Sequence, residues 1–166
     1  MTRTRRSRRL ALASSLVFLI GLTGCSATVS LDAAAGANDP RCADVIVRLP
    51  ASVDGQQRRW TDAQATGAWG DPSAVLLTCG LEAPGPSTLR CITVGGVDWL
   101  VDESESPRFR LTTYGRTPAV QVYVDNELVS PNNVLDDQRL AVSQIPKTSE
   151  CTNPEAPLDE QDDANG

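Results

Sequence analysis

The sequence predicts a single small α+β domain over residues 41–151, in which one C-terminal amphipathic helix packs on a mainly antiparallel, disulfide-stapled sheet. Three observations predict this fold. Short apolar runs alternate with polar residues along the domain, a Gly95-Gly96 pair joins two of these runs, and the apolar spacing becomes helical after residue 130. The length of 166 residues suits one domain with appendages.

The first half of the domain contains two predicted strands. Residues 45–49 alternate, which predicts a strand that ends at Pro50. Residues 74–79 are apolar on both faces, which is typical of a central strand covered on both sides. Residues 51–73 lie between them and contain several glycines and a proline, so we expect a mostly irregular segment there.

The second half predicts a hairpin, a meander and the helix. Residues 91–94 and 97–101 flank two glycines, which suit the positive φ angles of a type I′ turn. Residues 108–114 and 120–124 alternate, which predicts two further antiparallel strands with one buried face. Ser130 as N-cap and Pro131 at the first position predict a helix with apolar positions up to Ile145.

Residues 1–24 predict a lipoprotein signal peptide. Five arginines precede an uncharged apolar run that is too short to span a bilayer and suits a secretory signal. Leu22-Thr23-Gly24-Cys25 resembles the bacterial lipobox, so we expect lipidation at Cys25. An ordinary signal peptide with an incidental cysteine is the alternative. The pair Arg8-Arg9 leaves both general secretion and twin-arginine export open.

Both ends of the mature chain are predicted to be loose. Lipidated Cys25 and the small residues that follow it predict a flexible tether over residues 25–40, which would hold the domain on the extracytoplasmic face of the cell membrane. Residues 152–166 contain five acidic residues and no basic one, which predicts a disordered acidic tail.

Charge and composition exclude several classes of function. From Cys25 onward the chain has 10 basic and 21 acidic residues, which disfavours a phosphate-binding surface and therefore nucleic acid as a partner. The sequence contains no histidine, which excludes Ser-His-Asp and Cys-His catalysis and histidine-ligated zinc. We expect neither a cofactor nor a metal.

Four cysteines remain after Cys25, and an even number in an oxidising compartment predicts disulfides. Cys79 and Cys91 flank a short connection between strands, whereas Cys42 and Cys151 bracket the domain. We therefore expect the pairs Cys79–Cys91 and Cys42–Cys151, although four cysteines allow three connectivities. Zinc held by four thiolates is the alternative, which the lack of a CxxC pair disfavours.

Several short motifs resemble a known family. They are Cys42, Val47-Arg48-Leu49-Pro50, Ala68-Trp69-Gly70-Asp71-Pro72, Leu77-Thr78-Cys79-Gly80, Arg90-Cys91, Gly96-Val97-Asp98-Trp99, Thr113-Tyr114-Gly115-Arg116 and Pro118-Ala119-Val120. Together they resemble an actinobacterial family of secreted proteins and lipoproteins, the domain of unknown function 3515. The resemblance covers nearly all of residues 41–151 and implies a cell-envelope location without any particular activity.

Three groups of side chains are candidate sites. Trp60, Trp69 and Trp99 would line a ligand groove if exposed, and the segment with Trp60 and Trp69 is the candidate binding surface, although we expect Trp69 to pack inside. An anion site would need folding to gather Arg58, Arg59, Arg108, Arg110 and Arg116. A glycosidase pair would need Asp102, Glu103 or Glu105 in a cleft, and solvated surface charges are the simpler interpretation.

The sequence therefore predicts a lipid-anchored, non-enzymatic envelope protein that binds another envelope component, with a protein as the expected partner. Its membrane contact is the lipid on Cys25. One alternative is a lipoprotein that binds a small ligand or glycan through exposed tryptophans. The other is a hydrolase that works without histidine, for which no catalytic residue is apparent in the sequence.

Overall fold

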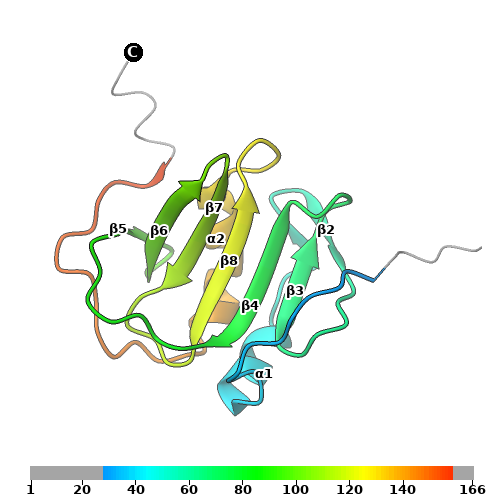
Figure 1. Cartoon of the computed structure of the whole chain (residues 1–166), viewed down its shortest axis with the longest axis horizontal. Coiled ribbons are helices and arrows are strands. Elements are labelled where there is room, and N and C mark those ends of the chain that lie inside the picture. The colour runs from blue at the N-terminus through cyan, green and yellow to red at the C-terminus, as the bar shows by residue number, and fades with distance from the viewer. Residues whose placement is uncertain (1–27, 159–166) are drawn as a thin grey trace, which may run out of the picture.

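The computed structural model describes residues 28–158, which form an eight-stranded antiparallel sheet and two helices (Figure 1). The order across the sheet is β1-β2-β3-β4-β8-β7-β6-β5. The strands are β1 (Ser52–Val53), β2 (Gln56–Arg59), β3 (Thr66–Trp69), β4 (Val75–Leu81), β5 (Arg90–Val94), β6 (Val97–Glu105), β7 (Arg108–Thr113) and β8 (Ala119–Asp125). The predicted α+β class with a mainly antiparallel sheet is confirmed.

The predicted hairpin and meander are present as β5 to β8. Gly95 and Gly96 have φ angles of 58° and 75°, which a type I′ turn requires at both positions. The turn sets a register in which Val94 pairs with Val97 and Ile92 with Trp99. β7 then pairs with β6 on one side and with β8 on the other. These elements were predictable because each depends on residues close in the sequence.

One face of the sheet carries the core. On β4 the side chains of Val75, Leu77 and Cys79 are fully buried, whereas Leu76 and Thr78 on the other face are half-buried. β8 repeats this pattern through three buried valines. Helix α2 (Pro131–Val142) packs on the buried face, and Figure 1 shows it behind the sheet. The prediction that residues 74–79 are covered on both sides is therefore wrong for the outer side.

Helix α2 starts as predicted. The Ser130 hydroxyl accepts a hydrogen bond from the amide of Asn133, and Pro131 takes the first helical position. The helix ends at Val142, and Ile145 follows in a tighter turn in which its amide bonds to the Val142 carbonyl. Ile145 is still fully buried, so the apolar pattern correctly identified it as a core residue.

The strand predicted over residues 45–49 is wrong, because residues 45 and 46 are the last of helix α1 (Pro40–Ile46) and residues 47 and 48 form a turn. The Asp39 carboxylate accepts from the amide of Arg41 at 2.9 Å, and Pro40 stands at the start of the helix. Cys42 and Val45 are both buried and three residues apart, which is the spacing of one helix face. Val45 and Leu49 are buried four positions apart, whereas Val47 between them is 75% exposed, and one buried face of a strand would include all three.

The segment of residues 51–73 is more regular than predicted. It forms β1, β2 and β3, and β3 pairs with β4 from Thr66↔Thr78 to Trp69↔Val75. These strands have two to four residues each, and β2 consists of four polar residues. Strands this short show no alternation in the sequence, so their structure depends on pairing, in which β3 pairs with β4, β2 with β3 and β1 with β2.

The predicted disulfide pairing is wrong, although all four cysteines are oxidised. The bonds are Cys42–Cys79 and Cys91–Cys151, in place of the predicted Cys79–Cys91 and Cys42–Cys151. Three strands separate β4 from β5, and Cys79 and Cys91 lie on opposite faces of the sheet. The short connection between these cysteines therefore crosses the end of the sheet without placing them side by side.

The segments next to the domain are more ordered than predicted. The amide of Val29 donates to the carbonyl of Trp60 at 2.8 Å and that of Gly36 to Gly80 at 2.9 Å, so residues 28–39 lie against the domain and the predicted flexible tether is wrong there. The predicted disorder of the tail is wrong for residues 152–158, because the amide of Glu155 donates to the Cys91 carbonyl at 2.7 Å and Leu158 packs on the core. The signal peptide, Cys25 and residues 159–166 lie outside the described residues.

Candidate functional site

The face of the sheet opposite α2 has no helix over it in the described part of the chain (Figure 1). Strand register arranges its side chains in two rows that cross the sheet. One row is Thr78, Gln121, Thr112, Leu100 and Cys91, and the other is Leu76, Tyr123, Arg110 and Asp102. These residues are called the open face below. All except Leu100 are half-buried, so this face is neither core nor ordinary surface.

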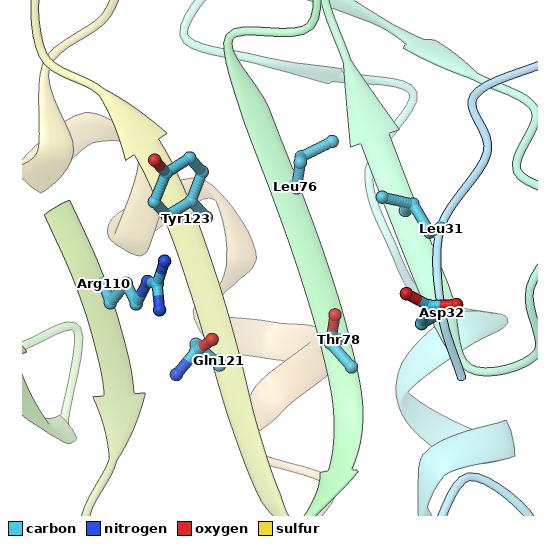
Figure 2. Close-up of a pocket in the computed structure, with 7 residues that line it drawn as sticks. All are labelled: Leu31, Asp32, Leu76, Thr78, Arg110, Gln121 and Tyr123. Atoms are coloured by element: carbon cyan, nitrogen blue, oxygen red, sulfur yellow. The ribbon is translucent and has the colours of Figure 1, made fainter. Parts of the chain in front are cut away.

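Two chain segments border the open face. At the β4 side, Leu31 and Asp32 of the N-terminal segment lie across from Leu76 and Thr78 (Figure 2). At the β5 side, residues 151–155 lie beside the open face, held there by the Cys91–Cys151 disulfide. The floor of the sheet therefore lies between raised segments at both sides, and this produces two hollows.

The larger hollow has a volume of about 510 Å³ and lies over β4, β8 and β7. Its lining residues are Leu31, Asp32, Leu76, Thr78, Arg110, Gln121 and Tyr123. Figure 2 shows Leu76 and Thr78 on β4, Gln121 and Tyr123 on β8 and Arg110 on β7. We call this hollow the β4–β7 groove. It combines aliphatic and aromatic surface with hydroxyl, amide and guanidinium groups.

Arg110, Tyr123 and Glu105 form a connected cluster at one end of the groove. Arg110 Nη2 lies 2.6 Å from Glu105 Oε1, and its guanidinium carbon lies 5.3 Å from the centre of the Tyr123 ring. The Tyr123 hydroxyl donates to Glu105 Oε2 at 3.0 Å. Burial raises the pKa of Tyr123, and the hydrogen bond to Glu105 raises it further. The cluster therefore holds a protonated tyrosine in a fixed orientation with its charges paired.

The middle of the groove retains hydrogen-bonding capacity. The Gln121 amide nitrogen donates to Thr112 Oγ1 at 3.0 Å, which orients the amide. Within the described part of the chain, neither the Gln121 carbonyl oxygen nor the Thr78 hydroxyl has a hydrogen-bond partner. An oriented acceptor beside a hydroxyl suits contact with the polar edge of a bound chain or ligand.

The second hollow lies next to the Cys91–Cys151 disulfide and has a volume of about 430 Å³. Leu100 and Tyr114 contribute to its lining, together with the connection before β5 and residues 151–155. Cys91 and Cys151 are half-buried, whereas Cys42 and Cys79 are fully buried. The two disulfides therefore differ in their access to solvent.

The tryptophans do not line a common groove. Trp69 and Trp99 are fully buried, and the Trp69 indole donates to the Pro50 carbonyl at 3.1 Å. Trp60 is 78% exposed and follows the end of β2. Trp69 packs inside as expected and therefore forms no part of the predicted binding surface. Of the two tryptophans of that surface, Trp60 alone is exposed.

The five candidate arginines do not gather into an anion site. Arg58 donates to the Leu49 carbonyl, Arg59 pairs with Asp71 at 3.0 Å and Arg108 with Asp125 at 3.4 Å. Arg116 is buried and donates to the Ile145 carbonyl, and Arg110 belongs to the groove cluster. Each cation thus has its own partner, and three strands separate the two arginines of β2 from the two of β7.

The candidate carboxylates lack the arrangement of a glycosidase pair. Glu103 pairs with Arg90 at 2.9 Å, and Glu105 belongs to the groove cluster. Hydrogen bonds from Ser104 lower the pKa of Asp102, whereas a general acid needs a raised one. Among residues 28–158, no group of three or more acidic or cysteine side chains is arranged to hold a metal ion.

Sequence reasoning missed the groove, although a signal for it was present. β7 and β8 place Arg110, Gln121 and Tyr123 at alternate positions between apolar residues. That pattern predicts a half-exposed face but does not show which strands are neighbours. β4 ends at Leu81 and β8 begins only at Ala119, yet the two strands pair directly and bring Leu76 beside Tyr123.

No helix in the described part of the chain is long and apolar enough to cross a membrane. Comparison with curated proteins and with solved structures finds no match. Residues 23–150 match the family model described as "Protein of unknown function (DUF3515)", and because this match covers most of the chain, the protein belongs to that family.

Proposed function

We propose that this chain is a lipid-anchored protein of the cell envelope whose domain binds another envelope protein through the open face and performs no catalysis. The observation that carries the proposal is the open face itself. It spans the centre of a rigid sheet, remains half-buried, and ends in a groove with a fixed tyrosine and unpaired polar atoms.

The proposed location is supported by two independent features. The arginine-rich start, the short apolar run and the lipobox-like Leu22-Thr23-Gly24-Cys25 are typical of an exported lipoprotein. The two disulfides suit an oxidising compartment outside the cytoplasm. Replacing Cys25 with serine should move the protein from the membrane fraction to the soluble fraction. Membrane retention of the processed Cys25→Ser protein would contradict the lipid anchor.

A protein partner suits the shape and chemistry of the open face. The floor is broad, because one of its rows crosses five strands and the other crosses four. The cluster of Arg110, Tyr123 and Glu105 is already charge-paired. Interfaces between proteins favour aromatic and arginine side chains held in place before binding. The absence of histidine from the sequence and the pairing of the carboxylates support a role without catalysis.

A glycan ligand is the second candidate, and Tyr123 favours it. An aromatic ring beside an amide and a hydroxyl is a common arrangement for binding polar ligands. Arg110 already covers the Tyr123 ring, which reduces the surface available for stacking a sugar. Glycan binding through several exposed tryptophans is not supported, because Trp69 and Trp99 are fully buried.

Site-specific photo-crosslinking in intact cells tests the proposed interface. A photoreactive amino acid replaces Leu76 in the groove, or Leu140 on the solvent side of α2 as a matched control. We expect a discrete protein adduct from position 76, none from position 140, and loss of the adduct on adding Tyr123→Ala. Equal adducts at both positions, or none at position 76 in a folded, membrane-bound protein, would contradict the proposed interface. An adduct that glycan-degrading enzymes remove would favour the second candidate.

A further inference from the structure

Trp60 is the most exposed large apolar side chain in the described part of the chain, at 78%. It follows β2, at the opposite side of the sheet from β5. Its carbonyl accepts a hydrogen bond from the amide of Val29 at 2.8 Å, and Val29 forms a bridge with Thr61. The described chain therefore begins directly beside Trp60.

The position of Cys25 places this tryptophan close to the proposed anchor. Val29 lies four positions after Cys25, and four residue steps span at most about 14 Å when fully extended. With the 2.8 Å hydrogen bond added, the backbone of Trp60 lies within about 17 Å of Cys25. The headgroup region on one side of a bilayer is about 5–8 Å thick. A lipid on Cys25 therefore keeps the β2 side of the domain at the membrane surface.

A second exposed apolar residue lies on the same side. Arg58 donates to the carbonyls of Ile46 and Leu49 at 3.5 and 3.3 Å, which holds the end of α1 against β2. Val47, between these two residues, is 75% exposed. The nearby Asp62 carboxylate accepts hydrogen bonds from Ser30 and Leu31, so it is already engaged by the segment that leads to Cys25.

We propose that Trp60 inserts into the headgroup region of the bilayer, so that the domain stands on the membrane on its β2 side. This inference rests on the proposed lipid anchor at Cys25. Tryptophan favours this region because its ring is apolar and its indole N–H still finds a polar partner. With the β2 side on the membrane, the open face stands upright, and a partner reaches it from the side.

Tryptophan fluorescence tests the inference directly. The sequence has three tryptophans, and the other two are fully buried, so quenchers report mainly on Trp60. The mature lipidated protein is reconstituted into vesicles of phosphatidylethanolamine and phosphatidylglycerol, in which part of the lipid carries brominated acyl chains. Compared with the protein free in solution, we expect a blue-shifted emission and a several-fold loss of quenching by aqueous iodide. We also expect quenching by the brominated lipid. All three effects should disappear in Trp60→Phe.

The control is Leu89→Trp in the Trp60→Phe background. Leu89 is 45% exposed and precedes β5, which lies six strand spacings, or about 29 Å, from β2. A tryptophan there should remain quenched by iodide and not by brominated lipid. Equal lipid quenching at positions 60 and 89, or none at position 60, would overturn the inference.

Flotation of the same vesicles separates this inference from the proposed anchor. If the wild-type protein floats with the vesicles while Trp60 stays open to iodide, Trp60 does not insert and the lipid anchor stands. If the lipid-processed protein does not float, both the anchor and the inference fail. Trp60→Phe should float as wild type does, because the acyl chains supply the attachment.

Discussion

The Asp54 carboxylate accepts a hydrogen bond from the backbone amide of Ser130 at 2.8 Å, across 76 residues of sequence. Its other oxygen accepts from the Asn133 side chain at 3.1 Å, and the Asp54 amide donates to the Asp137 carboxylate at 2.8 Å. These bonds join the turn between β1 and β2 to the first turns of α2. The short strands β1 and β2 thereby gain a fixed position relative to the helix.

Replacing Asp54 with alanine should lower the free energy of unfolding by about 1–3 kcal/mol, because two hydrogen bonds to the carboxylate are lost. Alanine is also disfavoured at the φ of 43° found at this residue. Asp54→Asn keeps an acceptor oxygen and tolerates this φ, so it should lose less. Urea unfolding of the oxidised protein measures both, with exposed Glu82→Ala as the charge control. An Asp54→Ala protein as stable as wild type would refute this role.

The two disulfides should differ in their contribution to stability. They join residues 37 and 60 positions apart, and chain entropy alone predicts about 3.8 and 4.3 kcal/mol, a difference too small to rank them. The burial of the two disulfides differs more than their chain entropy. Cys42 and Cys79, unlike the other pair, are fully buried, so their removal leaves a cavity in the core. We therefore expect the Cys42→Ala/Cys79→Ala protein to be the less stable double variant in thermal unfolding.

Solvent access gives the disulfides a further difference. A small water-soluble reductant should cleave Cys91–Cys151 before Cys42–Cys79, because only the first pair is partly exposed. Timed alkylation and peptide mapping under native conditions would show which thiols appear first. Simultaneous release of all four thiols would mean that cleavage requires unfolding of the whole domain.

Local sequence patterns predicted the elements that depend on neighbouring residues. The turn at Gly95-Gly96 and the cap at Ser130 each act within a few positions, and both are present. The pairing of Cys42 with Cys79 depends instead on where α1 lies relative to β4. The position of α1 relative to β4 depends on the order of the strands in the sheet. Neither spacing nor alternation within the sequence reveals this order.

The candidate site was less accessible to prediction than the fold. Trp69 was expected to pack inside, and its complete burial and its bond to Pro50 confirm this. The groove has no signal of comparable strength, because Leu76, Arg110 and Tyr123 come from three separate strands. A side chain at an alternate position of a strand faces either solvent or a groove, and only the neighbouring strands decide which.

Acid should weaken the attachment of the N-terminal segment at Asp62. The pKa of Asp62 lies below the ordinary 3.8, chiefly because the Leu31 amide and then the Ser30 hydroxyl donate to the carboxylate. A lowered folded-state pKa means that this contribution is fully present above pH 3.8 and is lost as the pH falls through the folded value. The amide resonance of Leu31 should therefore titrate below pH 3.8.

Asp62→Asn is the control for this titration, since it keeps an acceptor oxygen and removes the charge. The acid-dependent shift of the Leu31 resonance should vanish in that variant. A shift that persists in Asp62→Asn, or a midpoint above 3.8 in the wild-type protein, would show that a group other than Asp62 causes the titration of the Leu31 amide.

Gly80 should be intolerant of any side chain, because the N-terminal segment approaches its backbone closely. The Gly36 amide donates to the Gly80 carbonyl at 2.9 Å, and a Cβ on residue 80 would lie 2.5 Å from the Ala37 nitrogen. The φ of Gly80 is 105°, a region that L residues rarely adopt. We expect Gly80→Ala to lower the free energy of unfolding by about 1–3 kcal/mol from backbone strain alone, and further if the segment is displaced.

Gly85→Ala is the matched control, because nothing lies within 4 Å of a Cβ there. Hydrogen exchange mass spectrometry should show faster exchange over residues 29–37 in Gly80→Ala and unchanged exchange in Gly85→Ala. Unchanged protection of that segment in both variants would show that it can move aside without losing its contacts at Trp60 and Asp62.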